Sequence, residues 1–131
     1  MGKRKIWLVD DDADDQLFFL DALGEINSEI ECEIANNGQD ALDKLEASPL
    51  PELLFLDLNM PVMNGFDCLA EIRKISRYRD LPVVIFTTTS DLSTIKKTYE
   101  LGANGFFKKP NDFPTMRKKL EALLEMDFTQ K

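Results

Sequence analysis

The segment Leu53-Leu54-Phe55-Leu56-Asp57 is a short, continuously apolar run with an acid directly after it. Residues 6–9 and residues 83–86 form runs of the same kind, followed by Asp10 and by Thr87. Runs of this length without polar breaks are typical of strands buried on both faces, as in a parallel sheet covered by helices. The three runs therefore predict the centre of such a sheet.

A different pattern predicts an edge of the sheet. Ile30, Cys32 and Ile34 alternate with Glu31 and Glu33, which indicates a half-exposed strand. Residues 104–107 form a weaker candidate for a fifth strand.

Apolar residues at helical spacing lie after each of these strands. The five sets are Leu17, Leu20, Leu23; Ala41, Leu42, Leu45; Phe66, Leu69, Ile72, Ile75; Leu92, Ile95, Tyr99; and Phe113, Met116, Leu120, Leu124. Alternating strands and helices with short connections predict a doubly wound α/β fold, in which helices cover both faces of a five-stranded parallel sheet. We expect one domain over residues 1–131, with a core from about 4 to 127 and no output domain.

Composition excludes several kinds of site. The chain has no histidine, so a Ser-His-Asp or Cys-His nucleophile and a His-containing zinc site cannot form. Cys32 and Cys68 are too far apart for a C-x-x-C motif, and we expect free thiols. The net charge of −8 argues against nucleic-acid binding.

Targeting signals are not evident in the sequence either. No apolar run reaches the roughly 18 residues of a membrane span. The basic start, Met1-Gly2-Lys3-Arg4-Lys5, leads into a strand-length run and then into Asp10, unlike a secretory signal. We therefore expect a cytoplasmic protein without membrane contact.

Polar side chains follow the predicted strands where each strand ends. Asp10-Asp11-Asp12 follow the first strand, Asp57 the third, Thr87 the fourth, and Lys108-Lys109 the fifth. Ligands of doubly wound sheets bind at the carboxyl ends of the strands. We therefore expect acids, a hydroxyl and an ammonium group to meet at one edge.

Crowded carboxylates repel each other unless a cation lies between them. Mg²⁺ prefers oxygen ligands and binds through one or two carboxylates, waters and phosphate oxygens. A carboxylate beside it can act as a nucleophile and form an aspartyl-phosphate. A neighbouring lysine and hydroxyl would then hold the phosphoryl oxygens. The set has the parts for phosphoryl transfer to an aspartate.

Four motifs in order carry a resemblance to a known family. They are Leu8-Val9-Asp10-Asp11; Leu56-Asp57-Leu58-Asn59-Met60-Pro61 with Asn64-Gly65; Val84-Ile85-Phe86-Thr87; and Gly105-Phe106-Phe107-Lys108-Lys109-Pro110. Over nearly its whole length the chain resembles the CheY-like receiver domain of response regulators in two-component signalling, in its stand-alone form. The resemblance implies the flavodoxin-like strand order 2-1-3-4-5 with five helices.

The resemblance also implies a role for each matching residue. Asp57 would accept the phosphoryl group and, with Asp11 and the backbone carbonyl of Asn59, would bind Mg²⁺, while Asp10 would act through water. Lys109 and Thr87 would bind the phosphoryl group. Phe106 occupies the position of the family's switch aromatic, often a tyrosine, and Lys109-Pro110 resembles its cis X-Pro bond.

Other residues near the site keep two interpretations. Asp12 either caps the first helix or adds charge at the rim, whereas Asp14 and Asp15 suit the dipole of the first helical turn. Thr88 and Thr89 either line the entrance to the site or are ordinary loop residues.

The function expected from the resemblance is a phosphorylation-dependent signalling switch that is not an enzyme beyond its own phosphotransfer and dephosphorylation. A histidine kinase or phosphotransfer protein would supply the phosphoryl group, because the chain has no histidine of its own. Three alternatives stay open: a phosphorylation-independent binding module, an aspartate-nucleophile phosphatase and a flavin-binding protein. Asn59 stands where such a phosphatase would need an acid, and the acids of residues 10–15 would repel a flavin phosphate.

The signal would leave through protein–protein contact, through a homodimer or by phosphorelay. Leu92, Ile95 and Tyr99 are either an interface, with the fifth strand and fifth helix, or the buried side of the fourth helix. The basic pairs Arg73-Lys74, Lys96-Lys97 and Lys118-Lys119 are either solvated or dock an acidic partner. The acidic stretch after the first strand and Thr87-Thr88-Thr89-Ser90 resemble receivers that serve photoreceptor-type kinases, including phytochrome-type kinases.

Overall fold

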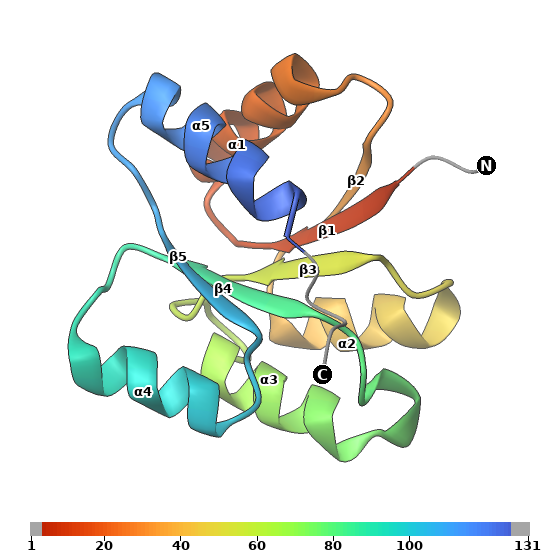
Figure 1. The fold of residues 1–131 in the computed structure, drawn as a ribbon. Coiled ribbons are helices and arrows are strands. Elements are labelled where there is room, and N and C mark those ends of the chain that lie inside the picture. The colour runs from red at the N-terminus through yellow and green to blue at the C-terminus, as the bar shows by residue number, and fades with distance from the viewer. Residues whose placement is uncertain (1–3, 127–131) are drawn as a thin grey trace.

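The computed structural model describes residues 4–126, in which strands and helices alternate (Figure 1). The strands are β1 (Lys5–Val9), β2 (Glu31–Ala35), β3 (Leu53–Leu56), β4 (Val83–Thr87) and β5 (Gly105–Lys108). The helices are α1 (Ala13–Ile26), α2 (Gly38–Ala47), α3 (Gly65–Lys74), α4 (Leu92–Glu100) and α5 (Phe113–Leu124), with a short 3₁₀ helix, η1 (Ser76–Tyr78), after α3. None of the helices between residues 4 and 126 has the length and apolar character that a membrane crossing requires.

All strand pairs are parallel, and the sheet order is β2-β1-β3-β4-β5. This confirms the predicted doubly wound fold, its strand order and the edge position of β2. The five predicted strands and five predicted helices are all present. The expected core limit at residue 127 lies just outside the described residues.

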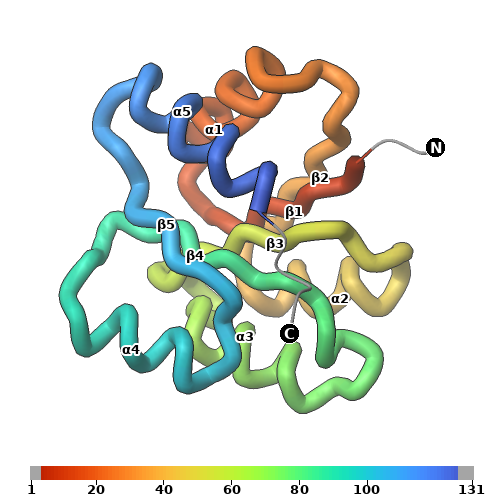
Figure 2. The backbone as a smooth tube through the Cα atoms, viewed as in Figure 1, coloured from red at the N-terminus to blue at the C-terminus, as the bar shows by residue number. Residues whose placement is uncertain are grey.

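The helices cover the sheet on both faces. Figures 1 and 2 show α1 and α5 over one face and α2, α3 and α4 over the other. Each face has its own core of buried side chains, because β1, β3 and β4 are apolar on both sides. The sheet therefore holds the ends of its central strands between two packed layers.

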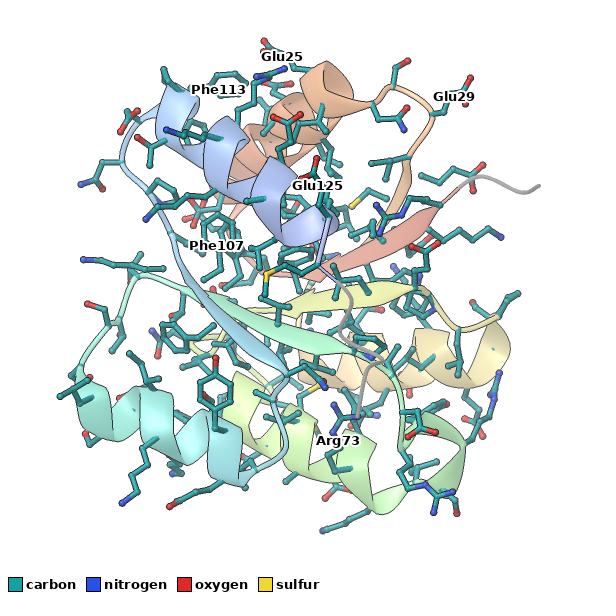
Figure 3. The ribbon with its side chains drawn as sticks, in the orientation of Figure 1. Glu25, Glu29, Arg73, Phe107, Phe113 and Glu125 are labelled. Carbon is teal, nitrogen blue, oxygen red and sulfur yellow. The ribbon has the colours of Figure 1, made fainter. Side chains whose placement is uncertain are left out.

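Aromatic rings dominate the core beneath α1 and α5. The Phe19 ring lies 5.0 Å from that of Phe55 and 5.5 Å from that of Phe86, and Phe86 lies 5.2 Å from Phe107. Figure 3 shows Phe107 on this side of the sheet, near α5. These contacts link α1 to β3 and β4 and, through Phe86, to β5, so they fix the position of α1 over the sheet.

Each α-helix begins after an Asp or Asn whose side chain accepts backbone N–H groups of the first turn. These N-caps are Asp12, Asn37, Asn64, Asp91 and Asp112. Such a cap stabilises a helix start by ~1 kcal/mol. In a parallel sheet every strand leads into the helix that follows, so the caps fix the loops at the carboxyl edge.

The predicted inner face of α1 is confirmed at Leu23 and wrong at Leu17 and Leu20. Leu17 is 59% exposed and Leu20 is also exposed, whereas Phe19, Ala22 and Leu23 are buried. The helix is turned so that the Phe19 ring enters the core and Phe18 packs partly buried at its side, and this leaves Leu17 and Leu20 outside. Both sets have helical spacing, so the periodicity alone could not choose between them.

The side chains of α4 lie mostly outside the core. Within the described chain, Thr98 alone of α4 is buried, while Leu92 is 83% exposed and Tyr99 47% exposed. A cation–π contact joins α4 to α3, with Lys97 Nζ 4.4 Å from the centre of the Phe66 ring. Of the two interpretations of Leu92 and Tyr99, the structure excludes the buried one.

Truncation of Phe19 should destabilise the protein far more than truncation of a residue on the exposed face of α1. We expect Phe19→Ala to lower the free energy of unfolding by about 3–5 kcal/mol through loss of buried contacts. Leu17→Ala, a matched change on the exposed face, should alter it by less than about 0.5 kcal/mol. Urea denaturation measures both values; a larger loss for Leu17→Ala would contradict the observed packing.

Candidate functional site

The register of the sheet brings the predicted site residues to one edge. Val9 pairs with Leu56, and Leu56 pairs with Ile85, so Asp10 and Asp57 leave adjacent strands at the same level. Thr87 pairs with Lys108, which places Lys109 just beyond the end of β4. The expected meeting of acids, hydroxyl and ammonium at the carboxyl edge is confirmed as geometry.

Lys109 is the centre of this cluster. Its Nζ lies 2.7 Å from Asp15 Oδ2, 2.9 Å from Asp10 Oδ2 and 3.2 Å from Asp57 Oδ2, and its side chain is 8% exposed. Burial alone would lower the pKa of this ammonium, but the hydrogen bonds and charges of the surrounding carboxylates raise it above its ordinary value. Lys109 is therefore a fixed positive charge.

Asp10 is fully buried. Its Oδ1 accepts a hydrogen bond from the Asp12 backbone N–H at 3.0 Å. Burial raises the pKa of Asp10 from 3.8 to about 6, and the Asp57 charge adds to the rise, against the opposing effect of Asp12 N–H and Lys109. The carboxylate is thus ionised at neutral pH, but burial disfavours the ionised form more than Lys109 and the Asp12 N–H stabilise it.

Asp57 lies between this lysine and the backbone of its own loop. Its Oδ1 accepts from the Leu58 N–H at 2.8 Å, and its Oδ2 faces Lys109. The Asp57 N–H donates to Val9 O at 2.9 Å, which continues the β1–β3 ladder. One carboxylate oxygen is therefore oriented by backbone and the other by charge.

The residues at this edge fit a hard divalent cation. Asp10, Asp11 and Asp57 each bring a carboxylate oxygen within 4.8 Å of the other two. Two of the three side chains are buried, and Lys109 supplies one positive charge against three negative ones. An all-oxygen donor set with excess negative charge is what such a cation requires. Asn59 follows in the exposed loop after Asp57, and its role as a ligand stays a prediction.

The loop after β3 is held by close backbone contacts. Gly65 N–H donates to Leu58 O at 2.9 Å, and a Cβ at residue 65 would collide with the backbone of Asp57 and Leu58. Gly38 approaches Met63 O, its N–H donating at 3.1 Å. In the same loop, Val62 is exposed and has a φ of 68°, in the left-handed region that β-branched residues disfavour. Glycine at 65 is what allows the loop to close beneath Asp57.

Thr87 ends β4 next to this cluster. It is fully buried, and its Oγ1 has no hydrogen-bond partner among residues 4–126. A buried hydroxyl without a hydrogen-bond partner is unfavourable. Thr87 is therefore suited to donate a hydrogen bond to an acceptor on a bound group. Thr88 is exposed and Thr89 partly buried, so the structure leaves both interpretations of these two residues open.

The comparisons with known proteins identify the family of this chain. A family model for the response regulator receiver domain matches residues 6–121. The chain belongs to the response regulator receiver domain family. Chemotaxis protein CheY1 of Helicobacter pylori (strain ATCC 700392 / 26695) is 30% identical over 120 residues, which cover 92% of this chain and 96% of CheY1.

Solved structures support the same assignment to receiver domains. The phosphorylated cyanobacterial phytochrome response regulator RcpA is similar at a TM-score of 0.87 and 27% identity, over 95% of this chain and 93% of RcpA. The Mn²⁺-bound response regulator Rcp1 is similar at a TM-score of 0.83 and 28% identity, over 95% of this chain and 96% of Rcp1. The chain is thus a CheY-like receiver domain of two-component signalling.

Within this receiver domain, Phe106 is partly buried and packs against the core beneath α2 and α3. Its neighbours in β5, Gly105 and Phe107, are buried. The Phe106 ring is therefore neither fully buried in the core nor fully exposed to solvent. The switching role of Phe106 stays a prediction.

One expectation about the receiver site needs correction. The predicted cis bond at Lys109-Pro110 is wrong, because all peptide bonds in residues 4–126 are trans. Lys109 is aimed instead by its N–H, which donates to Thr87 O at 2.7 Å, and by the carboxylates around its Nζ.

Sequence reasoning missed the contact that Asp15 makes at the site. Asp15 does lie in the first turn of α1, as predicted, but it is also the nearest carboxylate to Lys109. Asp14 shares the same chain environment and is exposed, so no sequence spacing could single out Asp15. Asp12 caps α1 through the N–H groups of Asp14 and Asp15, which settles its interpretation.

Removing the buried charge should stabilise the protein in magnesium-free buffer. We expect Asp10→Asn to raise the free energy of unfolding at pH 7 by about 1–3 kcal/mol, because the raised pKa means that ionised Asp10 disfavours the fold. The gain should be complete above about pH 6 and vanish below about pH 4, where Asp10 is protonated in both states.

Urea denaturation in EDTA across this pH range measures the effect. Asp14→Asn, an exposed acid in the same segment, is the control and should change stability by at most about 0.5 kcal/mol. A destabilised Asp10→Asn would contradict the electrostatic account of the site.

A methyl group should have opposite effects at two glycines. Gly65→Ala should lower the free energy of unfolding by about 2 kcal/mol or more, because the added Cβ meets backbone. Gly24→Ala, in an open position on α1, should raise it by about 0.5–1 kcal/mol. Thermal unfolding of both variants checks the pair; equal shifts would contradict the close approach at residue 65.

Proposed function

We propose that this receiver domain is a phosphorylation-dependent switch that accepts a phosphoryl group on Asp57. The observation that carries the proposal is the set of groups around Asp57: two further carboxylates for a cation, a buried lysine and a buried, unpaired threonine hydroxyl. Each of these groups has a use when a phosphoryl group is on Asp57, and the hydroxyl has no hydrogen-bond partner among residues 4–126.

The proposed donor is a phosphohistidine on a sensor histidine kinase or a phosphotransfer protein, since this chain has no histidine. A carboxylate oxygen of Asp57 attacks the phosphorus, the P–N bond of the donor breaks, and the imidazole leaves with the electron pair. Lys109 offers an N–H to the new phosphoryl oxygens, and Thr87 Oγ1 donates to another.

We propose Mg²⁺ as the resident cation, held by Asp11, Asp57 and the Asn59 carbonyl, with Asp10 acting through water. When bound, it would offset the negative charge that develops on the phosphoryl oxygens. The support is the oxygen donor set; the Mn²⁺-bound form of Rcp1, a relative at 28% identity, adds to it.

The proposed output surface is α4 with β5 and α5. The exposed Leu92 and Tyr99 favour contact with a downstream protein or with a second copy of the chain. Movement of Thr87 and Phe106 toward the phosphoryl group would bias this surface. A phytochrome-type kinase is the proposed input, supported by the likeness to RcpA, and the cytoplasm is the proposed location.

The alternatives receive less support. A phosphorylation-independent module would have no use for a buried Thr87 hydroxyl that lacks a hydrogen-bond partner within residues 4–126. A phosphatase would need an acid at Asn59 for general acid–base catalysis. We therefore propose no enzymatic turnover beyond the protein's own phosphotransfer and dephosphorylation.

Intact mass after incubation with acetyl phosphate tests the proposal. We expect one phosphoryl adduct on the wild-type protein that requires Mg²⁺ and is absent in EDTA, because ionised Asp57 is the nucleophile. Asp57→Asn should form no adduct, whereas Asp67→Asn, an exposed acid on α3, should react like the wild type. An adduct on Asp57→Asn, or none on a wild-type protein that binds Mg²⁺, would refute Asp57 as the acceptor from small donors.

A further inference from the structure

The ammonium of Lys109 has three N–H groups, and three carboxylates surround it among the described residues. Asp10 and Asp57 lie at strand ends, where the fold places their oxygens 2.9 and 3.2 Å from Nζ. Asp15 comes from a helix instead, and its Oδ2 is the nearest of the three at 2.7 Å. Lys109 therefore donates hydrogen bonds to Asp15 and Asp57 and forms an ion pair with Asp10, with no phosphoryl group present.

Asp15 is held in place by the start of α1. Asp12 Oδ1 accepts the Asp15 N–H at 3.0 Å, which fixes the backbone of the first turn. Gln16, the next residue, donates from Nε2 to Asp10 O at 2.6 Å and to Asn36 Oδ1 at 3.0 Å, which joins this turn to the ends of β1 and β2. The Asp15 carboxylate thus faces Lys109 from a braced position.

The contact has a direct consequence for phosphoryl binding. A phosphoryl group on Asp57 would need the positive charge and one N–H of Lys109. Asp15, on α1, partly neutralises that charge through its own ion pair with Lys109. Asp15 also adds negative charge at a site that already contains Asp10, Asp11 and Asp57. Both effects disfavour an anionic donor.

We infer that Asp15 is a positioning residue that competes with the phosphoryl group for Lys109 and so slows phosphorylation of Asp57. The inference rests on the proposed function, because it concerns the same transfer. It differs from a general charge effect, since Asp14 carries the same charge one residue away and is not one of the carboxylates around Lys109.

Phosphorylation rates with acetyl phosphate at saturating Mg²⁺ test the inference. We expect Asp15→Asn and Asp15→Ala to react about threefold to tenfold faster than the wild type, as loss of one partly exposed ion pair allows. Asp14→Asn, which removes the same charge, should stay within about twofold, and Asp15→Glu should restore the slow rate.

A second measurement tests the contact itself. Hydrogen exchange of the Lys109 ammonium, followed by ¹⁵N NMR and assigned with Lys109→Arg, should be faster in Asp15→Asn and unchanged in Asp14→Asn. A merely structural role of Asp15 would alter thermal unfolding without moving this signal, so melting curves of all variants accompany it.

The outcomes separate the two proposals. A wild-type protein without a Mg²⁺-dependent adduct would refute the proposed function. A wild-type adduct with Asp15→Asn no faster than Asp14→Asn, or slower than the wild type, would overturn only the inference about Asp15. An unchanged Lys109 exchange rate in Asp15→Asn would overturn it as well.

Discussion

The ion-pair cluster around Lys109 is the constraint on which the site depends. Asp10 and Asp57 are buried acids, and a buried acid is strongly unfavourable without a nearby positive charge. The ammonium group of Lys109 lies within ion-pair distance of both acids and also of Asp15 on α1. The cluster thereby joins the ends of β1, β3 and β5 with the first helix. It leaves excess negative charge, which explains why the same edge suits a cation.

The rest of the fold serves to keep this edge in register. Parallel pairing aligns the strand ends, the aromatic core between α1 and the sheet fixes the first helix, and side-chain caps fix each helix start. Gly65 lets the loop after Asp57 close without a clash. Arg73 holds the opposite end of the molecule together, its guanidinium donating to carbonyls of Gly102, Tyr78 and Leu81 (Figure 3).

The strands were predictable because each central strand is an unbroken apolar run that only a two-sided core explains, and the site followed because polar residues end those runs. The inner face of α1 was not fully predictable from the sequence. Leu17 and Phe19 each belong to a set of apolar residues at helical spacing, and only the shape of the core decides that the Phe19 ring is the buried one. Asp15 was not predictable either. It differs from Asp14 only in facing Lys109, 94 residues later in the chain.

The weak packing of α4 against the sheet has a consequence for local unfolding of the protein. With Thr98 as its buried side chain in the described chain, α4 has little apolar area to lose when it detaches, unlike α1 and α5. Its backbone amides therefore belong to the low-energy end of local unfolding, whereas those of β1, β3 and β4 open only with the whole domain. Of the five helices, α4 therefore loses the least buried surface when it is displaced, while the strands beneath it stay in place.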